Sequence, residues 1–227
     1  MPMLSADDTR GPARDLTFTL IMALAAVAAA WAAYQATAWS SEESQAYLSS
    51  MALRTESARA DSTADAQRVQ DVLVFTEWSD AIAQESAADP SALPTTSYTP
   101  RSGTRSAFLF HQFRPELVTA FDVWITDGPF TVDAPGTPFD LPEYTLAAQV
   151  EAQSLADQAQ AEADAAGQAS SRSSGYVRSG VLFALVLFFA SIGSKARTVR
   201  SSRILMWCSV AALAITLTVL LTYPVTF

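Results

Sequence analysis

Residues 181–221 read VLFALVLFFASIGSKARTVRSSRILMWCSVAALAITLTVLL, which is two apolar runs joined by a short basic segment. The charge-free stretch before that segment covers residues 179–194, and the one after it covers residues 204–227. A third charge-free stretch, residues 16–41, lies near the N-terminus. A helix that crosses a bilayer needs about 20 predominantly apolar residues. The sequence therefore predicts three membrane-spanning helices.

The middle run is short for a full span and can be extended toward the N-terminus through Tyr176 and Val177. This requires Arg178 to reach the lipid headgroups with its long side chain. Two alternatives stay open. The runs could be buried core helices of a soluble protein, although they are apolar on every side. The first run, which follows Arg10 and Arg14, could be a cleaved signal peptide.

Charge asymmetry predicts the orientation of the spans. The basic segment carries four cations: Lys195, Arg197, Arg200 and Arg203. Arg10 and Arg14 precede the first span. Cytoplasmic loops carry an excess of Lys and Arg, so both basic regions are expected in the cytoplasm, where the four cations would also meet anionic lipid headgroups. A nucleic-acid or phosphate site is the weaker interpretation of the same cluster.

The predicted fold class is an all-α membrane protein with three transmembrane helices and a long antiparallel helical segment between spans one and two. The expected location is the plasma (inner) membrane, with the N-terminus cytoplasmic and residues 40–175 and the C-terminus extracytoplasmic. The parts are a tail 1–15, span one 16–39, an acidic helical domain 40–175, span two 176–194, a basic loop 195–203, span three 204–223 and an outer tail 224–227.

Composition adds two constraints on the segment outside the membrane. Residues 40–175 contain 20 acids and 7 bases, a net charge of −13. Cys208 is the single cysteine and lies in the third span, so no intrachain disulfide is possible. The expected outer boundary is marked by aromatic residues, which favour membrane interfaces: Trp31, Tyr34, Trp39, Tyr176 and Tyr223.

The pattern of helix breakers divides the outer segment. Residues 40–86 contain no Pro or Gly, which favours one helix continuous with the first span. Proline-rich loops are expected at 87–104 and 127–142. Residues 114–125 show helical spacing of apolar side chains. Residues 143–171 repeat alanine at steps of three and four, which predicts a helix that returns antiparallel to the first.

Two sets of side chains are expected to pack these helices. An aromatic cluster should form the packed head of the outer segment: Phe75, Trp78, Phe108, Phe110, Phe113, Phe121 and Trp124. A face of small residues in the first span should allow close helix contact: Ala25, Ala29 and Ala33. Such a face serves packing within the chain or a partner surface, and the sequence does not separate the two.

Motifs of catalysis and cofactor binding are absent from the sequence, so we expect no enzyme activity and no cofactor. The single histidine, His111, has no second His or Cys in the outer segment with which to share a metal. It is expected to be a packing residue. Asp127, Asp133 and Asp140 could supply oxygen ligands to calcium, but their spacing matches no calcium loop.

Four segments resemble a family of uncharacterised small bacterial membrane proteins with a YQAxxWS / FRPE…AFxxW / PFxxPEY pattern: YQATAWS at 34–40, FRPELVTAFDVW at 113–124, PGTPFDLPEY at 135–144 and YVRSGVLFALVLFFASIG at 176–193. The resemblance implies one span, an outer helical segment and a pair of spans. It implies no activity. Ala38 stands where the family pattern has a basic residue.

The leading hypothesis is a non-enzymatic membrane accessory or scaffold protein that associates with itself or with a larger membrane complex. Its partners would be membrane lipids and a protein or a second copy, with no nucleic acid and no identified small-molecule substrate. A subunit of an oligomeric channel or transporter is one alternative. It is weakened because the spans carry no ionisable residue at their centres. An extracytoplasmic sensor without an output domain is another.

Overall fold

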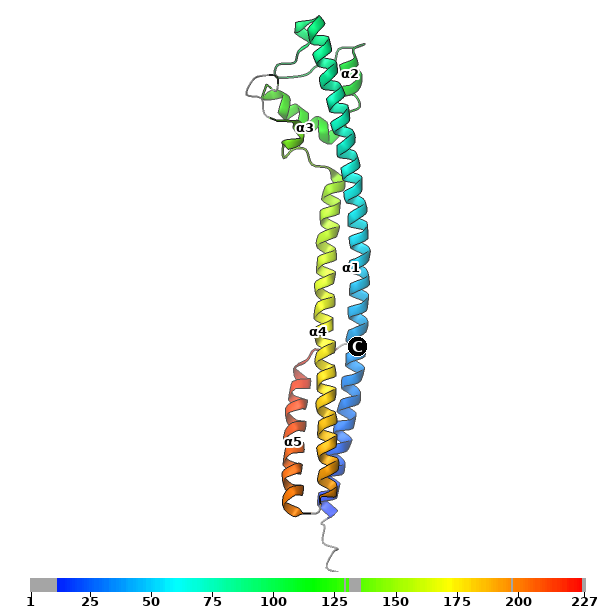
Figure 1. The fold of residues 1–227 in the computed structure, drawn as a ribbon, viewed down its shortest axis with the longest axis vertical. Helices are drawn as coiled ribbons and strands as arrows, with labels where there is room; N and C mark the ends of the chain where they lie inside the picture. The colour runs from blue at the N-terminus through cyan, green and yellow to red at the C-terminus, as the bar shows by residue number, and fades with distance from the viewer. Residues whose placement is uncertain (1–11, 129, 131–135, 197, 226–227) are drawn as a thin grey trace, which may run out of the picture. The chain divides into compact units, whose positions relative to one another are not determined.

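The structure, a computed structural model, describes residues 12–128, 130, 136–196 and 198–225. Every regular element within these residues is helical (Figure 1). The elements are α1 (Pro12–Ala88), η1 (Pro90–Ala92), α2 (Arg105–Phe110), α3 (Pro115–Thr126), η2 (Pro138–Asp140), α4 (Ala147–Lys195) and α5 (Val199–Thr222).

The chain divides into two compact units. One contains residues 1–50 and 160–227 and is called the membrane unit below. The other contains residues 51–159 and is called the head unit. Within the described residues, three helices are long and apolar enough to cross a membrane, namely α1, α4 and α5. The apolar windows of these helices agree with the three runs seen in the sequence.

Helix α1 is continuous from Pro12 to Ala88, which confirms that residues 40–86 continue the first apolar run as one helix. No Pro or Gly occurs between Pro12 and Pro90, so nothing in the chain removes a helical hydrogen bond. The helix ends because Asp89 precedes Pro90, and a residue before proline is driven out of the helical region. Asp89 instead caps η1 through its side chain, which accepts a hydrogen bond from the Ser91 amide.

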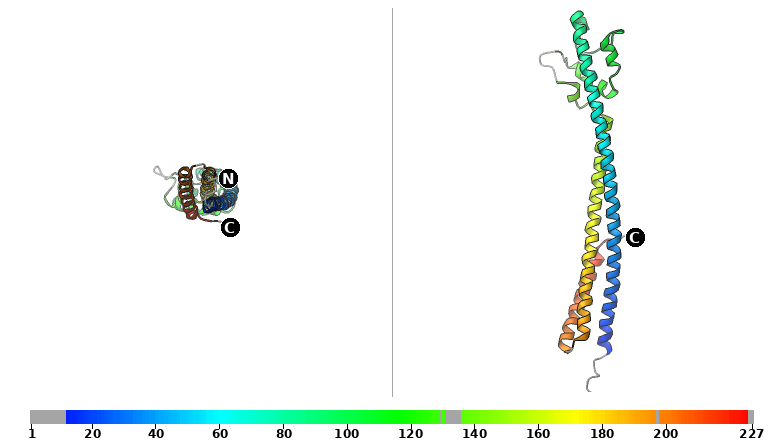
Figure 2. Two further views of the ribbon diagram at one scale, coloured as in Figure 1. Left: turned by 90° about the horizontal axis from the view of Figure 1, so that it is seen from below. Right: turned by 45° about the vertical axis from the view of Figure 1, so that its right-hand side comes forward.

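In the membrane unit, α4 contacts both other helices. A Cβ placed on Gly193 of α4 would lie 2.8 Å from the ring of Phe18 on α1 and 3.1 Å from Cβ of Leu205 on α5. Near the other end of the unit, the Ser173 hydroxyl of α4 donates to the carbonyl of Ala36 on α1. The two contacts show that α1 and α4 run in opposite directions here, and Figure 2 shows the three helices lying side by side.

Helix α5 begins earlier than predicted. The sequence places a loop at 195–203, but α4 extends to Lys195 and α5 starts at Val199. Thr198 explains the early start, because its hydroxyl caps the helix by accepting a hydrogen bond from the Ser201 amide. Arg200 therefore lies on the first turn of α5 rather than in a linker.

In the head unit, α2 and α3 lie beside α1 (Figure 1) and share one core with it. Phe75, Trp78 and Phe121 are buried in this core, as predicted. Phe108 is not, because it is 67% exposed. The six-residue helix α2 buries Ser106, Ala107 and Leu109, and Phe108 falls on its opposite face.

Helix α4 begins at Ala147, four residues after the predicted start at Glu143. The preceding residues are held in a non-helical path by their buried side chains. Tyr144 and Leu146 both lie in the head core, and the Tyr144 amide bonds back to the carbonyl of Leu141. Tertiary burial therefore overrides helix propensity over these residues.

Candidate functional site

The predicted topology residues lie at one end of the membrane unit. Lys195 is the last residue of α4, and Arg200 and Arg203 lie on the first two turns of α5. All three are exposed, and Arg197 lies outside the described residues. Cations at a helix N-terminus face the positive end of the helix dipole. Anions outside the chain, such as lipid phosphates, would relieve that repulsion.

The three predicted packing alanines differ in burial within the membrane unit. Ala25 is buried, Ala29 is half-buried and Ala33 is exposed. The structure instead buries Ala32 and Ala36 together with Ala25. Repeated steps of four drift around a helix, whereas a seven-residue step such as Ala25 to Ala32 keeps a contact face straight. Ala25 and Ala29 therefore pack within the membrane unit, and a partner contact at Ala33 stays a prediction.

Opposite the basic end, two side chains of the membrane unit donate to one backbone carbonyl. Trp39 Nε1 lies 3.1 Å from the Pro224 carbonyl oxygen, and Tyr176 Oη lies 3.0 Å from the same atom. We call Trp39, Tyr176 and Pro224 the aromatic latch. The Arg172 guanidinium lies over the Trp39 ring, 4.5 Å from its centroid. The latch fixes the segment that follows α5 against α1 and α4.

Sequence reasoning expected the latch aromatics only as separate anchors at a membrane interface. Gly175 is the feature of the sequence that points to their contact, because a side chain at this position would collide with Tyr223 at the end of α5. A Cβ on Gly175 would lie 2.9 Å from the Tyr223 ring. The glycine thus lets Tyr223 approach α4, where its ring lies 5.4 Å from that of Tyr176.

The head core is built from aromatic rings. Four of its predicted packing residues lie in one buried cluster: Trp78, Phe113, Phe121 and Trp124. Trp78 has no exposed surface and meets Tyr98 and Phe121 edge to face at centroid distances of 5.2 and 4.9 Å. Trp124 Nε1 donates to the carbonyl of Gly136. Edge-to-face pairs add to the area that each ring buries.

One acidic side chain, Asp71, is buried on the packed face of α1. It accepts a 2.9 Å hydrogen bond from Tyr144 Oη, and Arg114 Nε lies 4.0 Å away. Burial is the main cause that raises the pKa of Asp71, while the Tyr144 hydrogen bond and Arg114 oppose it. Burial, and then Asp71, also raises the pKa of Tyr144. The network ties α1 to the start of α3 and to the segment before α4.

The sequence carries a signal for the burial of Asp71. Asp71 lies on the same buried face of α1 as Ala64, Phe75 and Trp78. A single acidic residue among apolar residues at helical spacing therefore implies a specific partner for its carboxylate. Burying an ionised carboxylate without one is costly. The chemistry of the network is structural, because its groups bond to one another.

The head unit also contains a polar pocket of about 250 Å3. The Glu85 carboxylate accepts hydrogen bonds from the Ser106 amide at 3.0 Å and from its hydroxyl at 2.7 Å. Tyr98 Oη donates to the same hydroxyl. At the rim, Arg101 pairs with Asp89 at 3.0 Å. Other hydroxyl groups lining the pocket belong to Ser91, Thr95, Ser97 and Thr99.

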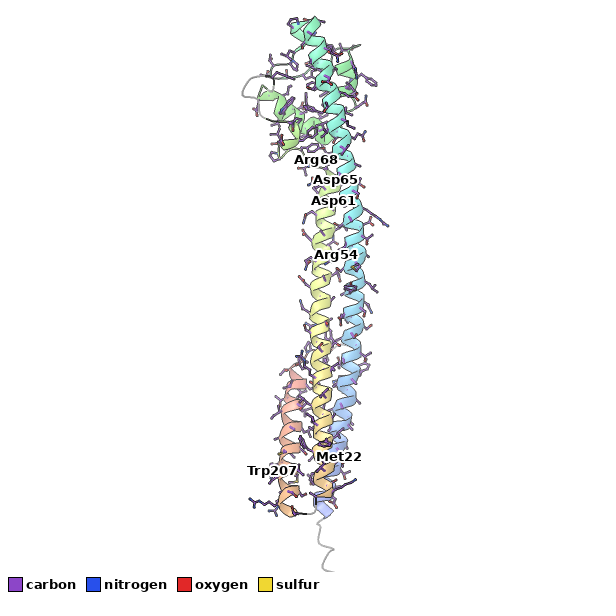
Figure 3. The ribbon with its side chains drawn as sticks, viewed as in Figure 1. Met22, Arg54, Asp61, Asp65, Arg68 and Trp207 are labelled. Atoms are coloured by element: carbon purple, nitrogen blue, oxygen red, sulfur yellow. The ribbon has the colours of Figure 1, made fainter. Side chains whose placement is uncertain are left out.

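An exposed apolar patch lies on α1 in the head unit. It consists of Val69, Val72 and Leu73, with exposed fractions of 61, 39 and 60%. Steps of three and four place these side chains on one face. Asp65 and Arg68, both exposed and labelled in Figure 3, precede the patch along α1. We refer to Val69, Val72 and Leu73 as the α1 patch.

The candidate metal ligands are not brought together. Asp133 lies outside the described residues, and the Asp140 carboxylate accepts both the amide and the hydroxyl of Thr137 at 2.8 Å. His111 is exposed and forms the C-cap of α2 rather than packing inside. Among the described residues, no group of three or more His, Cys, Asp and Glu side chains is placed to hold a metal ion.

No family model, curated protein or solved structure matches this chain. The resemblance to small bacterial membrane proteins therefore stays a prediction. Any function must therefore be argued from the geometry of four features: the basic helix end, the aromatic latch, the polar pocket and the α1 patch.

Proposed function

We propose that this protein is a non-enzymatic integral membrane accessory or scaffold protein that associates through helices outside the bilayer. The N-terminus and the basic end of the membrane unit lie in the cytoplasm, and the head unit lies on the other side. Parts of α1 and α4 form an antiparallel stalk. One contact between the helices supports this pairing: Ser57 Oγ donates to the Ala152 carbonyl. Farther along α1, Asp71 accepts from Tyr144 Oη in the segment before α4, as an antiparallel path requires.

The α1 patch is the observation that carries the proposal. Apolar side chains with exposed fractions as high as 61% on a regular helix outside the predicted spans mark a surface suited to protein contact. The same helix buries Phe75 and Trp78 on its other side. The patch therefore adds nothing to the head core and is available to a partner.

The partner that best fits the α1 patch is a second copy of this chain. All copies in one membrane share an orientation, so their α1 helices run parallel and present the patch at the same height. Asp65 lies beside the patch and is exposed, whereas Arg68 is held within its own head unit by the Phe139 carbonyl and the Tyr144 ring, so the contact between copies would rest on the apolar side chains. Such two-fold pairing is the commonest symmetry of protein oligomers.

Disulfide crosslinking in native membranes tests the pairing. In a Cys208→Ser background, Leu73→Cys places a thiol in the α1 patch, and Thr119→Cys places one at an exposed position on α3 as the control. Mild oxidation should convert Leu73→Cys to a dimer and leave Thr119→Cys monomeric. Equal crosslinking of both variants, or monomer alone, would reject pairing through the patch. A crosslink from position 73 to another protein would assign it to a larger complex.

The basic residues support the orientation and a lipid partner. Lys195, Arg200 and Arg203 are exposed at one end of the membrane unit. Juxtamembrane cations of this kind are attracted to anionic headgroups by about 1 kcal/mol each. Replacing all three with glutamine should weaken the orientation preference of spans two and three, which reporter fusions at the C-terminus would measure.

An extracytoplasmic sensor is the second candidate function, and the polar pocket favours it. Its hydroxyl groups, with Glu85 and Arg101, suit a small neutral molecule rich in hydroxyl groups. Such a ligand should raise the midpoint of thermal unfolding of the full-length protein in detergent, because binding to the folded state alone stabilises it. Ser97→Phe, which puts a large ring on one of the residues that line the pocket, should abolish that rise. If no polyol or sugar raises the midpoint, this function is rejected.

A further inference from the structure

The membrane unit contains an apolar groove between α1 and α5. Its volume is about 390 Å3, and it is lined by Leu24, Val27, Ala28, Trp31, Leu213, Leu217, Leu220, Leu221, Tyr223 and Val225. Its walls open outward, because Val27 and Leu221 are 71 and 78% exposed. We propose that this groove binds one acyl chain of an anionic phospholipid, whose phosphate is held by Arg172. The site is independent of the proposed association through the α1 patch.

The length of the groove favours a lipid chain over a transmembrane helix. On α1 it extends from Leu24 to Trp31, and on α5 from Leu213 to Leu221. At 1.5 Å per residue these walls are roughly 10 and 12 Å long. The hydrocarbon core of a bilayer is about 30 Å thick, so the groove covers less than half of it. An acyl chain belongs to one leaflet, whereas a spanning helix would need a face along the whole core.

The end of the groove lies at the aromatic latch. Tyr223 and Val225, which line the groove, flank Pro224, and the Pro224 carbonyl accepts from Trp39 and Tyr176. This closes the groove at the depth where aromatic side chains meet headgroups. A chain bound there therefore has its polar end beside the latch.

Arg172 supplies the charge that complements a phosphate. Its guanidinium lies 4.5 Å from the centroid of the Trp39 ring and pairs with no carboxylate among the described residues. Arginine binds phosphate oxygens through two parallel N–H donors. An acyl chain gains little free energy when it moves from the surrounding lipid tails into an apolar groove. The contact between Arg172 and the phosphate therefore decides which lipid is retained.

Native mass spectrometry of the full-length protein, extracted from membranes in mild detergent, tests the site. Wild type should retain one phospholipid, with phosphatidylglycerol preferred over phosphatidylethanolamine when both are supplied. Leu217→Trp and Val27→Trp each fill the groove from one wall and should abolish retention. Arg172→Gln should lower the occupancy by anionic lipid about tenfold, as expected for losing a charge-assisted hydrogen bond. Leu185→Trp, at an exposed position on α4 away from the groove, is the matched control.

Equal lipid retention in all five proteins would show only annular lipid and overturn the proposal. If wild type instead retained a second copy or another protein, and both groove variants lost that partner rather than a lipid, the proposal would also be overturned. A second measurement needs no variant. Phosphatidylglycerol with a photoreactive acyl chain should label peptides 24–31 and 213–221 of wild type at least severalfold more than peptide 182–192. Labelling of peptide 182–192 at the same level would contradict the site.

Discussion

The membrane unit and the head unit pack their helices in different ways. The membrane unit brings backbones close together with small residues, as where Gly193 meets Phe18 and where Ala25 and Ala32 are buried. The head unit fills its centre with rings, and Trp78 alone lies within about 6 Å of Phe75, Tyr98, Phe113 and Phe121.

The difference follows from the solvent around each unit. Lipid tails are as apolar as leucine, so spans associate through close packing and hydrogen bonds rather than through the hydrophobic effect. The head unit, which we propose lies outside the bilayer, would be surrounded by water, where burial of each large ring contributes several kcal/mol. Substitutions in the two units should therefore have separable effects.

Trp78→Ala should have the largest effect, and only in the head unit. Truncating a fully buried aromatic side chain costs about 3–5 kcal/mol. Hydrogen exchange of the full-length protein in detergent should show lost protection in the head helices. Peptides from the three spans should keep their protection.

Trp207→Ala is the matched control for that substitution. Trp207 lies on α5 of the membrane unit with 68% of its surface exposed, as the label in Figure 3 locates it. Its removal should leave exchange unchanged in both units. Loss of protection in the spans of Trp78→Ala would show that the two units do not unfold separately.

Gly193→Ala should have the next largest effect, and only in the membrane unit. Its Cβ would lie 2.8 Å from two ring atoms of Phe18, so the helices must move apart. Overpacking of this kind costs about 1–3 kcal/mol. Gly180→Ala is the control, because a Cβ there meets nothing within 4 Å, and it should stabilise α4 by about 0.4–1 kcal/mol. Thermal unfolding in detergent should give opposite shifts, and equal shifts would contradict this packing.

The sequence predicts the helices better than it predicts their faces. Charge-free runs and the lack of breakers suffice for α1 and for the apolar windows of α4 and α5. Burial faces depend on which neighbour a helix meets, so the burial predicted for Phe108 was wrong. The latch could not be foreseen, because it joins Trp39, Tyr176 and Pro224 from three distant parts of the chain. Local patterns contain no such pairing.

Trp39→Phe should have a smaller effect that is confined to the end of the membrane unit. It removes one of the two donors to the Pro224 carbonyl, and a net loss of about 0.5–1.5 kcal/mol is expected for one hydrogen bond. Adding Tyr176→Phe leaves the carbonyl unsatisfied and should cost more than the sum of the single changes. Hydrogen exchange of the last turn of α5 measures this, and strict additivity would argue against a shared acceptor.

Asp71→Asn should have the smallest effect and a distinct pH dependence. The pKa of Asp71 is raised in the folded state, so that state binds the proton more tightly than the unfolded chain does. This contribution to stability is lost as pH rises through the raised pKa. The substitution should therefore cost more at acidic pH than at neutral pH.

Comparison with wild type isolates the Asp71 contribution. Hydrogen bonds lower the pKa values of Asp89 and Asp140, which lie away from Asp71, and their contributions are lost as pH falls, equally in both proteins. The difference in unfolding free energy between wild type and Asp71→Asn, measured by denaturant titration from pH 7 to pH 4, should grow toward pH 4. A difference that shrinks toward pH 4 would mean that Asp71 is held ionised.

Thiol labelling of intact cells tests most directly whether the two units lie on opposite sides of the bilayer as proposed. In a Cys208→Ser background, Thr119→Cys marks the head unit and Ala196→Cys marks the turn between α4 and α5. A membrane-impermeant maleimide should label position 119 in intact cells and position 196 only after permeabilisation. Labelling of position 196 but not 119 in intact cells would contradict the orientation and the role proposed for the basic residues.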